Sequence, residues 1–406
     1  MKNSRNSSFL MCYNIYCIIM FKMRGDNRVT KVFISAGEAS GDMHAAALTR
    51  AILQQDPSAQ VFGMGGEALA AAGGEVVFNY KEYSVMGFVE VVKALPKLFG
   101  LKKAFRRLME ERKPDVFVTV DYPDFNMRVA REAKALGIPV FSYIPPSAWA
   151  WRRGRAKMVA QLCTKVACIY PFAAKVYEEA GAPVEFVGNP LVDIVQPELS
   201  PQEGEALIGK RAGHPVVLLL PGSRVKEITG VLPVMLQALP LIKKQRPDVD
   251  FVLQKAPSIE RGLLDSILAQ STEPVKVVEG HNYDVMTASD VALATSGTVT
   301  LEAALCGLPA VICYCASALS IFLARHLVYV KYCGLPNILA GKEILPELIQ
   351  EDMTPERMAS SVLAFLEPEG AERVRHELQQ AVAKLGKPGA VDRTAALILK
   401  TAKEKE

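Results

Sequence analysis

Residues 290–305 read DVALATSGTVTLEAAL, and this stretch decides the fold class. An apolar run suited to a buried strand ends at Ala294 and is followed by a turn of small, mostly hydroxyl-bearing residues and a helical segment. A strand, a short turn and a helix in this order form the repeating unit of parallel α/β sheets. The turn and the single carboxylate of the helix, Glu302, favour either a capped helix with a solvated side chain or a site for an anionic ligand.

The same alternation continues in both directions along the chain. Strands are predicted at 30–35, 115–120, 139–144, 165–170, 184–187, 215–220, 250–254, 275–279, 290–294 and 310–314. Helices are predicted at 42–54, 125–136, 152–162, 172–180, 225–244, 259–270 and 298–306, and the charged stretch 356–404 is also expected to be helical. Continuous apolar strands separated by helices predict parallel sheets that are covered on both faces.

The chain of 406 residues is long enough for two domains. A polar stretch with several prolines, 189–213, predicts a linker between two Rossmann-like domains that face each other across a cleft, one over 23–188 and one over 214–370. Helices over 371–406 complete the chain, and whether they cross back to the first domain stays open. We expect residues 1–22 to be an atypical extension that reflects a misassigned start, because their apolar run 9–21 is too short to span a membrane and no signal-peptidase site follows it.

Composition excludes several classes of protein. A net charge of +4 and the lack of any nucleic-acid-binding motif argue against a nucleic acid partner. The 8 cysteines show no paired CxxC spacing, so we expect free thiols and no structural zinc. Neither G-x-G-x-x-G nor G-x-x-x-x-G-K-[ST] occurs, which disfavours dinucleotide-dependent oxidoreductases and P-loop enzymes.

Ligands of parallel sheets bind beyond the carboxyl ends of the strands, so the segments that follow the strands hold the candidate residues. After strand 30–35 come Gly37, Glu38, Ser40, Gly41 and Asp42, where two glycines would let a ligand approach the backbone and Asp42 could start the helix. An ordinary strand–helix turn explains this segment equally well.

Strand 115–120 is followed by Asp121, a candidate general base, and by Asp124, which is well placed to cap the next helix. A loop hydrogen bond is a nearly equal explanation for Asp121. Strand 139–144 is followed by PPSAWAWRRGR, in which Ser147, Trp149 and the arginines suit a phosphorylated, partly apolar substrate. A core tryptophan beside a basic helix start is the alternative.

Two segments favour a nucleoside diphosphate. Gly222, Ser223 and Arg224 follow strand 215–220 and offer amides, a hydroxyl and a guanidinium to an anion, although a Ser-capped surface helix stays an alternative. In the opening stretch, Ser296, Gly297 and Thr298 would hold a diphosphate at the helix N-terminus. Glu302 lies one turn further on the same face, where it would accept two ribose hydroxyls.

The chain resembles the lipid-A-disaccharide synthases, which are bacterial glycosyltransferases of the GT-B type. The resemblance runs from about Val29 to the C-terminal region and rests on AGEASGD (36–42), VMGFVEV (85–91), KPDVFVTVDYPDFN (113–126), PSAWAWR (146–152), LLPGSR (219–224), SGTVTLEAAL (296–305) and LPNILAG (335–341). Two departures are Pro145, where the family often has Ser, and Asn189, where a His is common.

The resemblance implies that 2,3-diacylglucosamine moves from its UDP derivative to 2,3-diacylglucosamine 1-phosphate, with inversion, to give UDP and a β(1→6) disaccharide 1-phosphate. It implies a required acidic residue at Asp121, which we interpret as the general base, and UDP binding by Arg224, Ser296, Gly297, Thr298 and Glu302. Asn337 lies in a family motif without an assigned role. Helix dipoles and Arg224 would neutralise the departing diphosphate, so we expect no metal and no cofactor.

Acylated substrates imply a peripheral protein on the cytoplasmic face of the inner membrane. We expect 95–112, with Leu95, Leu98, Leu101, Phe105 and Leu108 on one stripe beside dense cations, to contact the membrane, and 319–332 is a second apolar, basic segment. Core-facing helices are the usual alternative for such patterns. Whether the protein forms a homodimer stays open. Competing functions are a UDP-N-acetylglucosamine 2-epimerase and a non-catalytic carrier of nucleotides or lipids.

Overall fold

The computed structural model describes residues 29–83, 88–316, 326 and 328–404. The N-terminal segment 1–22, the first part of the VMGFVEV motif and most of 319–332 therefore lie outside the described residues. Backbone contacts divide the chain into two compact units, one running to Phe141 and including Ala395–Glu406, the other comprising Ser142–Thr394. The domain boundaries inferred from the sequence stay predictions.

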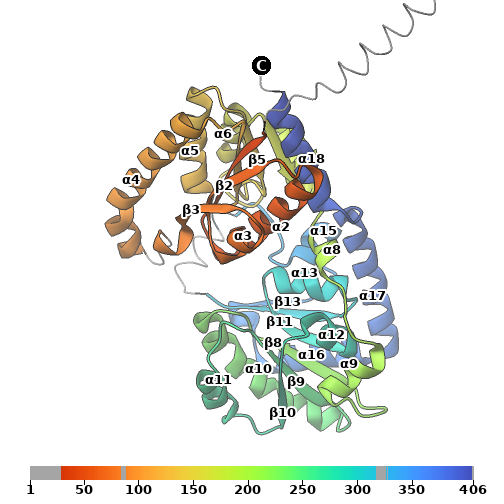
Figure 1. The fold of residues 1–406 in the computed structure, drawn as a ribbon. Helices are drawn as coiled ribbons and strands as arrows, with labels where there is room; N and C mark the ends of the chain where they lie inside the picture. Colours follow the sequence, from red (N-terminus) through yellow and green to blue (C-terminus); the bar gives the residue numbers. More distant parts are fainter. Residues whose placement is uncertain (1–28, 84–87, 317–325, 327, 405–406) are drawn as a thin grey trace, which may run out of the picture. The chain divides into compact units, whose positions relative to one another are not determined.

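The first sheet has seven strands in the order β3-β2-β1-β4-β5-β6-β7, and Figure 1 labels β2, β3 and β5. β1 pairs in parallel with both β2 and β4. Its strands are β1 (Lys31–Ala36), β2 (Gln60–Gly65), β3 (Glu75–Asn79), β4 (Val116–Val120), β5 (Val140–Tyr143), β6 (Lys165–Cys168) and β7 (Val184–Phe186). The connecting helices are α2 (Ala39–Gln55), α3 (Glu67–Ala71), α4 (Phe88–Arg112), α5 (Pro123–Ala135), α6 (Gly154–Leu162) and α7 (Pro171–Glu179), with a 3₁₀ turn η1 (Tyr80–Glu82).

The second sheet has six parallel strands in the order β10-β9-β8-β11-β12-β13 (Figure 1). They are β8 (Val216–Leu220), β9 (Asp250–Lys255), β10 (Val275–Glu279), β11 (Val291–Thr295), β12 (Ala310–Tyr314) and β13 (Glu347–Ile349). The helices from here to the C-terminus are α8 (Leu191–Ile194), α9 (Pro201–Ile208), α10 (Val225–Gln245), α11 (Arg261–Leu268), α12 (Asn282–Ala288), α13 (Thr298–Leu305), α15 (Leu335–Ala340), α16 (Pro355–Leu366), α17 (Pro368–Val382) and α18 (Ala390–Lys403), with 3₁₀ turns η2 (Gln350–Asp352) and η3 (Ala383–Leu385).

Both sheets reverse their strand order once. In the first sheet the chain moves from β1 outward to β3 and then returns to place β4 on the other side of β1. In the second sheet β8 and β11 are related in the same way. The segments beyond the carboxyl ends of strands at such a switch point diverge and leave room for a ligand. The topology therefore selects four segments, those after β1, β4, β8 and β11, and all four were candidates from the sequence.

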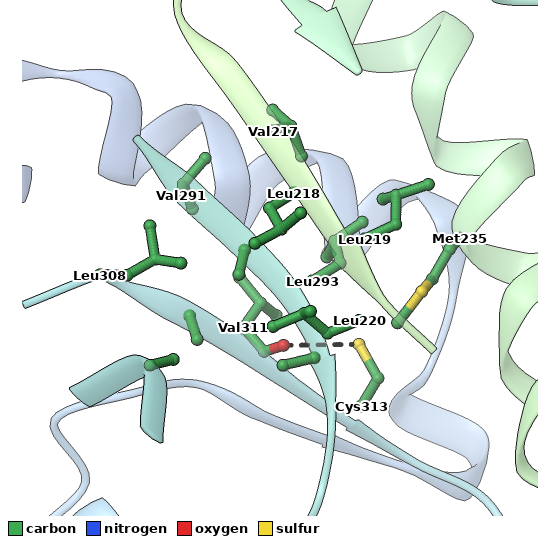
Figure 2. Close-up of a cluster of buried hydrophobic side chains, with 14 of the residues drawn as sticks. Val217, Leu218, Leu219, Leu220, Met235, Val291, Leu293, Leu308, Val311 and Cys313 are labelled. Atoms are coloured by element: carbon green, nitrogen blue, oxygen red, sulfur yellow. Dashed lines mark hydrogen bonds between the residues drawn. The ribbon is translucent and has the colours of Figure 1, made fainter. Parts of the chain in front are cut away.

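Apolar side chains from neighbouring strands fill the core of the second sheet. Figure 2 shows labelled side chains of β8, β11 and β12 together with Met235 of α10. Leu218, Leu293 and Val311 are all fully buried, which explains why these strands read as continuous apolar runs. The Cys313 thiol donates a weak hydrogen bond of 3.7 Å to the Val311 carbonyl oxygen, as expected of a free buried cysteine.

Among the described residues, α10 is the one helix long and apolar enough to cross a membrane. Its residues Ile228, Val231, Leu232 and Met235 lie in the core of the second sheet, and the helix packs against α16. These contacts give it the role of a covering helix of a parallel sheet.

Several elements differ from the prediction. The stretch 189–213 contains two helices, α8 and α9, and α9 is stabilised by a capping box between Ser200 and Glu203. The strands β2, β3 and β13 and the helices α3, α12 and α15 were not predicted. β2 contains Gly63 and Gly65, and β13 has three residues, so neither shows a clear strand pattern.

Candidate functional site

Strand register brings the segments after β1 and β4 together. Ala36 at the end of β1 pairs with Val120 at the end of β4, so Gly37 and Asp121 leave the sheet side by side. Burial, and next the negative charge of Glu38, raise the pKa of the Asp121 carboxyl group. A half-buried carboxylate with a raised pKa at a switch point has the properties of a general base.

The backbone that carries Asp121 is strained. Asp121 and Tyr122 have φ values of 48° and 49°, although neither is glycine. The Tyr122 ring occupies the space beside Gly37, where a Cβ atom would lie 2.2 Å from Tyr122 Cδ1. Gly37 is thus required by a contact inside the protein, and this contact was not visible in the sequence.

Two carboxylates in these segments have positions different from those expected. α2 begins at Ala39, with Glu38 as N-cap, so Asp42 does not start the helix. Instead its buried carboxylate accepts hydrogen bonds from the backbone N–H groups of Gly66, Ala68 and Leu69, at 2.7, 3.1 and 3.2 Å, and caps α3. Asp124 does not cap α5, because the N-cap position belongs to Tyr122.

The remaining candidates in the segments after β1 and β5 differ in their exposure. Ser40 is exposed in the first turn of α2, and Gly41 is buried beside Ala36. Ser147 is exposed in the segment after β5. Trp149 is half-buried and packs edge-on against Phe172, with ring centroids 4.7 Å apart. Their roles in substrate binding stay predictions.

The segments after β8 and β11 line one pocket of about 440 Å³ within the second unit. Seven of its lining residues were candidates from the sequence: Gly222, Ser223, Arg224, Ser296, Gly297, Thr298 and Glu302. The two motifs are more than 70 residues apart in the chain and meet because Leu220 of β8 pairs with Ala294 of β11. The fold therefore brings both predicted anion-binding motifs into one cavity.

The helix that opens this pocket begins as predicted. α13 starts at Thr298, and its N-cap residue Gly297 provides no side chain to satisfy the first N–H groups. The Ser296 hydroxyl donates a hydrogen bond of 3.2 Å to the carbonyl oxygen of Cys333, which restrains the turn between β11 and α13. The N-terminus of α13 is therefore an electropositive wall of the pocket.

Glu302 lies one turn inside α13. Its Oε1 atom accepts a hydrogen bond of 3.3 Å from the Tyr283 hydroxyl group. Burial, and next the negative charge of Glu302, raise the pKa of Tyr283 to about 12. Burial raises the pKa of Glu302, and the Tyr283 hydroxyl partly offsets that increase. A carboxylate held in this way at the pocket can accept hydrogen bonds from a vicinal diol.

Arg224 and Glu227 also line this pocket. Arg224 is the N-cap of α10, and its side chain, 77% exposed, reaches Glu227 Oε1 at 3.1 Å. Glu227 Oε2 accepts from the N–H groups of Ser223 and Arg224 at 3.0 and 3.2 Å, so no serine cap is present. Because Arg224 is largely exposed, its guanidinium can turn to an anion in the pocket at little cost.

The side chain of Asn337 forms hydrogen bonds with neighbouring protein groups. It is fully buried, and its amide group donates to the Leu345 carbonyl and to Glu347 Oε1, both at 2.8 Å. Its carbonyl oxygen accepts from the N–H groups of Ile344 and Leu345, both at 2.9 Å. Glu347 also accepts a hydrogen bond of 2.8 Å from the N–H group of Cys333. The carbonyl oxygen of Cys333 in turn accepts the hydrogen bond from the Ser296 hydroxyl group.

The pocket residues Gln254 and Asn282, and the Glu302 partner Tyr283, were not predicted from the sequence. Gln254 donates to Asn282 Oδ1 at 2.8 Å and to the carbonyl of Gly280 at 3.0 Å. Asn282 and Tyr283 follow the carboxyl end of β10, and ligands of parallel sheets bind beyond the carboxyl ends of strands, so the position of both residues is a signal in the sequence.

Comparison with known proteins identifies a family. The family model described as lipid-A-disaccharide synthetase matches residues 32–401. The lipid-A-disaccharide synthase of Syntrophus aciditrophicus (strain SB) is 40% identical over 377 residues, which cover 92% of this chain and 98% of the relative. That of Geobacter sulfurreducens is 40% identical over 375 residues, with the same coverage of both chains.

Solved structures with the same fold are more distant in sequence. UDP-GlcNAc 2-epimerase of Neisseria meningitidis, bound to UDP-GlcNAc, has a TM-score of 0.59 at 14% identity and covers 92% of this chain and 98% of its own. A glycosyltransferase of Rickettsia africae has a TM-score of 0.58 at 12% identity, with coverages of 94% and 100%. These similarities confirm the predicted GT-B type of fold, with two parallel α/β sheets.

Proposed function

The chain belongs to the family of lipid-A-disaccharide synthetases, and on that premise we propose that it joins two acylated glucosamine units. The donor is the UDP derivative of 2,3-diacylglucosamine, and the acceptor is 2,3-diacylglucosamine 1-phosphate. The acceptor 6-hydroxyl oxygen forms a bond to C1 of the donor while the bond between C1 and the diphosphate oxygen breaks. The electron pair leaves with UDP, and the anomeric configuration inverts.

One observation carries the donor half of this proposal: two separate anion-binding motifs and Glu302 line the same pocket. The diphosphate would bind to the N-terminus of α13 and to the segment Gly222–Arg224, where amide dipoles and a guanidinium stabilise the negative charge of departing UDP. The Glu302 carboxylate would accept the two ribose hydroxyl groups.

Asp121 would receive the proton of the acceptor hydroxyl. Its raised pKa matches a base that must hold a proton after transfer, and its place at the switch point of the first sheet is where a ligand would bind. Asp121→Asn keeps the shape of the side chain and removes the base. We expect a loss of about 10²- to 10⁴-fold in kcat, measured as UDP and disaccharide formed from the two acylated substrates.

The same assay separates the competing functions. Conversion of water-soluble UDP-N-acetylglucosamine to its 2-epimer would favour an epimerase. Binding of UDP without turnover by the wild-type protein would favour a carrier. Disaccharide formation that is unchanged in Asp121→Asn would contradict the role of this carboxylate as the base.

We also propose that the protein works on the cytoplasmic face of the inner membrane, because both substrates carry acyl chains. Part of the predicted contact surface is wrong: Leu101, Phe105 and Leu108 of α4 are buried in the core. Lys103 and Arg107 of the same helix are exposed and are the cations that could meet anionic lipids.

A further inference from the structure

We infer that Asn126 is a positioning residue, which holds the strained turn that presents Asp121. This role rests on the proposed function in so far as Asp121 acts on the acceptor. Asn126 belongs to the first turn of α5 and is fully buried, so it cannot contact a substrate itself.

The turn needs a restraint. Asp121 and Tyr122 are two successive non-glycine residues in the left-handed region, where the Cβ atom lies too close to the following carbonyl oxygen. Strain of this kind persists only where the surrounding structure fixes it. Relaxation of either residue to a negative φ would change the direction in which the Asp121 carboxylate leaves the backbone.

The Asn126 side chain provides that restraint through three hydrogen bonds. Its Nδ2 atom donates to the Asp121 carbonyl oxygen at 2.7 Å and to the Ser35 carbonyl oxygen at 3.2 Å. Its Oδ1 atom accepts from the Ser35 hydroxyl group at 2.7 Å. Because Ser35 is in β1, the amide group ties the turn after β4 to the neighbouring strand, 91 residues away in the chain.

Burial makes this network strong. Asn126 and Ser35 are both fully buried, so no water competes for their hydrogen bonds, and the loss of one partner leaves a buried polar group unpaired. The network also keeps the segment after β1, with Gly37 and Glu38, in a fixed position relative to Asp121. The carboxylate of Asp121 is thus aligned by a side chain that is itself fully buried.

The test compares three variants. Asn126→Ala removes all three hydrogen bonds, Ser35→Ala removes only the bond to Oδ1, and Thr49→Val is the control because it removes a single buried hydroxyl bond, to Ala45, elsewhere in the first unit. A misplacement of about 1 Å at a reacting group costs roughly a hundredfold in rate. We expect kcat to fall about a hundredfold in Asn126→Ala, to fall less in Ser35→Ala, and to stay within twofold in Thr49→Val.

Unfolded protein would lower the apparent kcat and leave the Michaelis constant unchanged, so kcat is referred to the folded fraction, measured by circular dichroism. The Michaelis constant of the donor should stay within about threefold of the wild-type value in Asn126→Ala, because the donor pocket belongs to the second sheet. A wild-type kcat in Asn126→Ala, or a kcat equal to that of Thr49→Val, would overturn the inference.

A crystal structure of Asn126→Ala tests the inference without any assay. We expect the φ angles of Asp121 and Tyr122 to become negative. If both keep the values of 48° and 49°, the inference is wrong even if the enzyme is active as proposed. If they relax and the wild-type protein makes no disaccharide, the proposed function fails and the positioning role stands.

Discussion

Asp121 and Glu38 are two carboxylates on neighbouring segments of the first sheet, and their proximity has a consequence for pH dependence. Burial and the charge of Glu38 raise the pKa of Asp121. A general base acts only when deprotonated, so kcat should fall as the pH falls through this raised pKa rather than through the ordinary value of an aspartate. Saturation with donor keeps the titration of Glu302 in the free pocket out of the measurement.

Glu38→Gln removes the repulsive charge, so it should lower the pKa of Asp121 and move the acid limb of the pH–kcat profile to lower pH. Glu38→Asp keeps the charge and serves as the control, with its acid limb near that of the wild type. An acid limb at the same pH in Glu38→Gln and in the wild type would show that the two carboxylates do not interact.

Candidate residues of the site can be predicted from the sequence when they all lie in one short segment. Ser296, Gly297, Thr298 and Glu302 form a local sequence pattern, and all four line one pocket, while their binding of UDP stays a prediction. The hydrogen bonds of Asn126 and the contact of Tyr122 with Gly37 join segments that are far apart in sequence, so no local pattern indicates them. For Asp42 the local pattern was misleading. It suggested a cap of the helix that follows strand β1, whereas the carboxylate caps α3.

Helix α10 depends on the glycine that precedes it. Gly222 has a φ of 110°, and a Cβ atom there would lie 2.6 Å from Oε2 of Glu227. Gly222→Ala would therefore strain the backbone and displace the carboxylate that caps Ser223 and Arg224. We expect a loss of about 1–3 kcal/mol in the free energy of unfolding, measured by urea denaturation, and weaker binding of UDP.

Gly262 is the matched control for this change. It lies in the first turn of α11, where a Cβ atom would point into open space, with no neighbouring group within 4 Å. Gly262→Ala should leave the stability unchanged or increase it by up to about 1 kcal/mol, because alanine has the higher helix propensity. Equal stability of the Gly222→Ala and wild-type proteins would contradict the proposed strain.

Long, apolar helices and strands were placed correctly from the sequence more often than short or polar ones. β8 and β11 were placed within one residue because they are fully buried runs bounded by polar turns. β2, with its glycines, and α9, in a stretch rich in proline and glutamate, were missed or read as irregular. Tertiary contacts decide such segments, and a local pattern cannot show them.

The two sheets and their switch points explain where the candidate site lies. Whether the protein binds a membrane depends instead on the charged and apolar side chains at its surface. Lys102 and Arg106 of α4 form ion pairs with Glu132 at 2.8 and 2.6 Å, so their charges are already partly neutralised. Lys103 and Arg107 are exposed on the same helix, and Phe99 is 55% exposed. We expect the protein to bind vesicles of anionic lipid, and to bind them more weakly at higher salt.

The double variant Lys103→Glu/Arg107→Glu should reduce this binding about tenfold or more, because each basic residue near an anionic surface contributes about 1 kcal/mol. The control, Lys244→Glu/Arg375→Glu, makes the same change in net charge at exposed positions of the second unit. Equal vesicle binding by both double variants, measured by sedimentation, would exclude α4 as the contact surface.

Binding of the nucleotide in the pocket at the N-terminus of α13 can be measured by titration calorimetry with UDP. We expect the wild-type protein to bind UDP at a single site. We also expect Glu302→Ala to raise the Kd about ten- to a hundredfold, because the hydrogen bonds to a charged group are lost. No measurable heat with the wild-type protein, or the same Kd in Glu302→Ala, would contradict it.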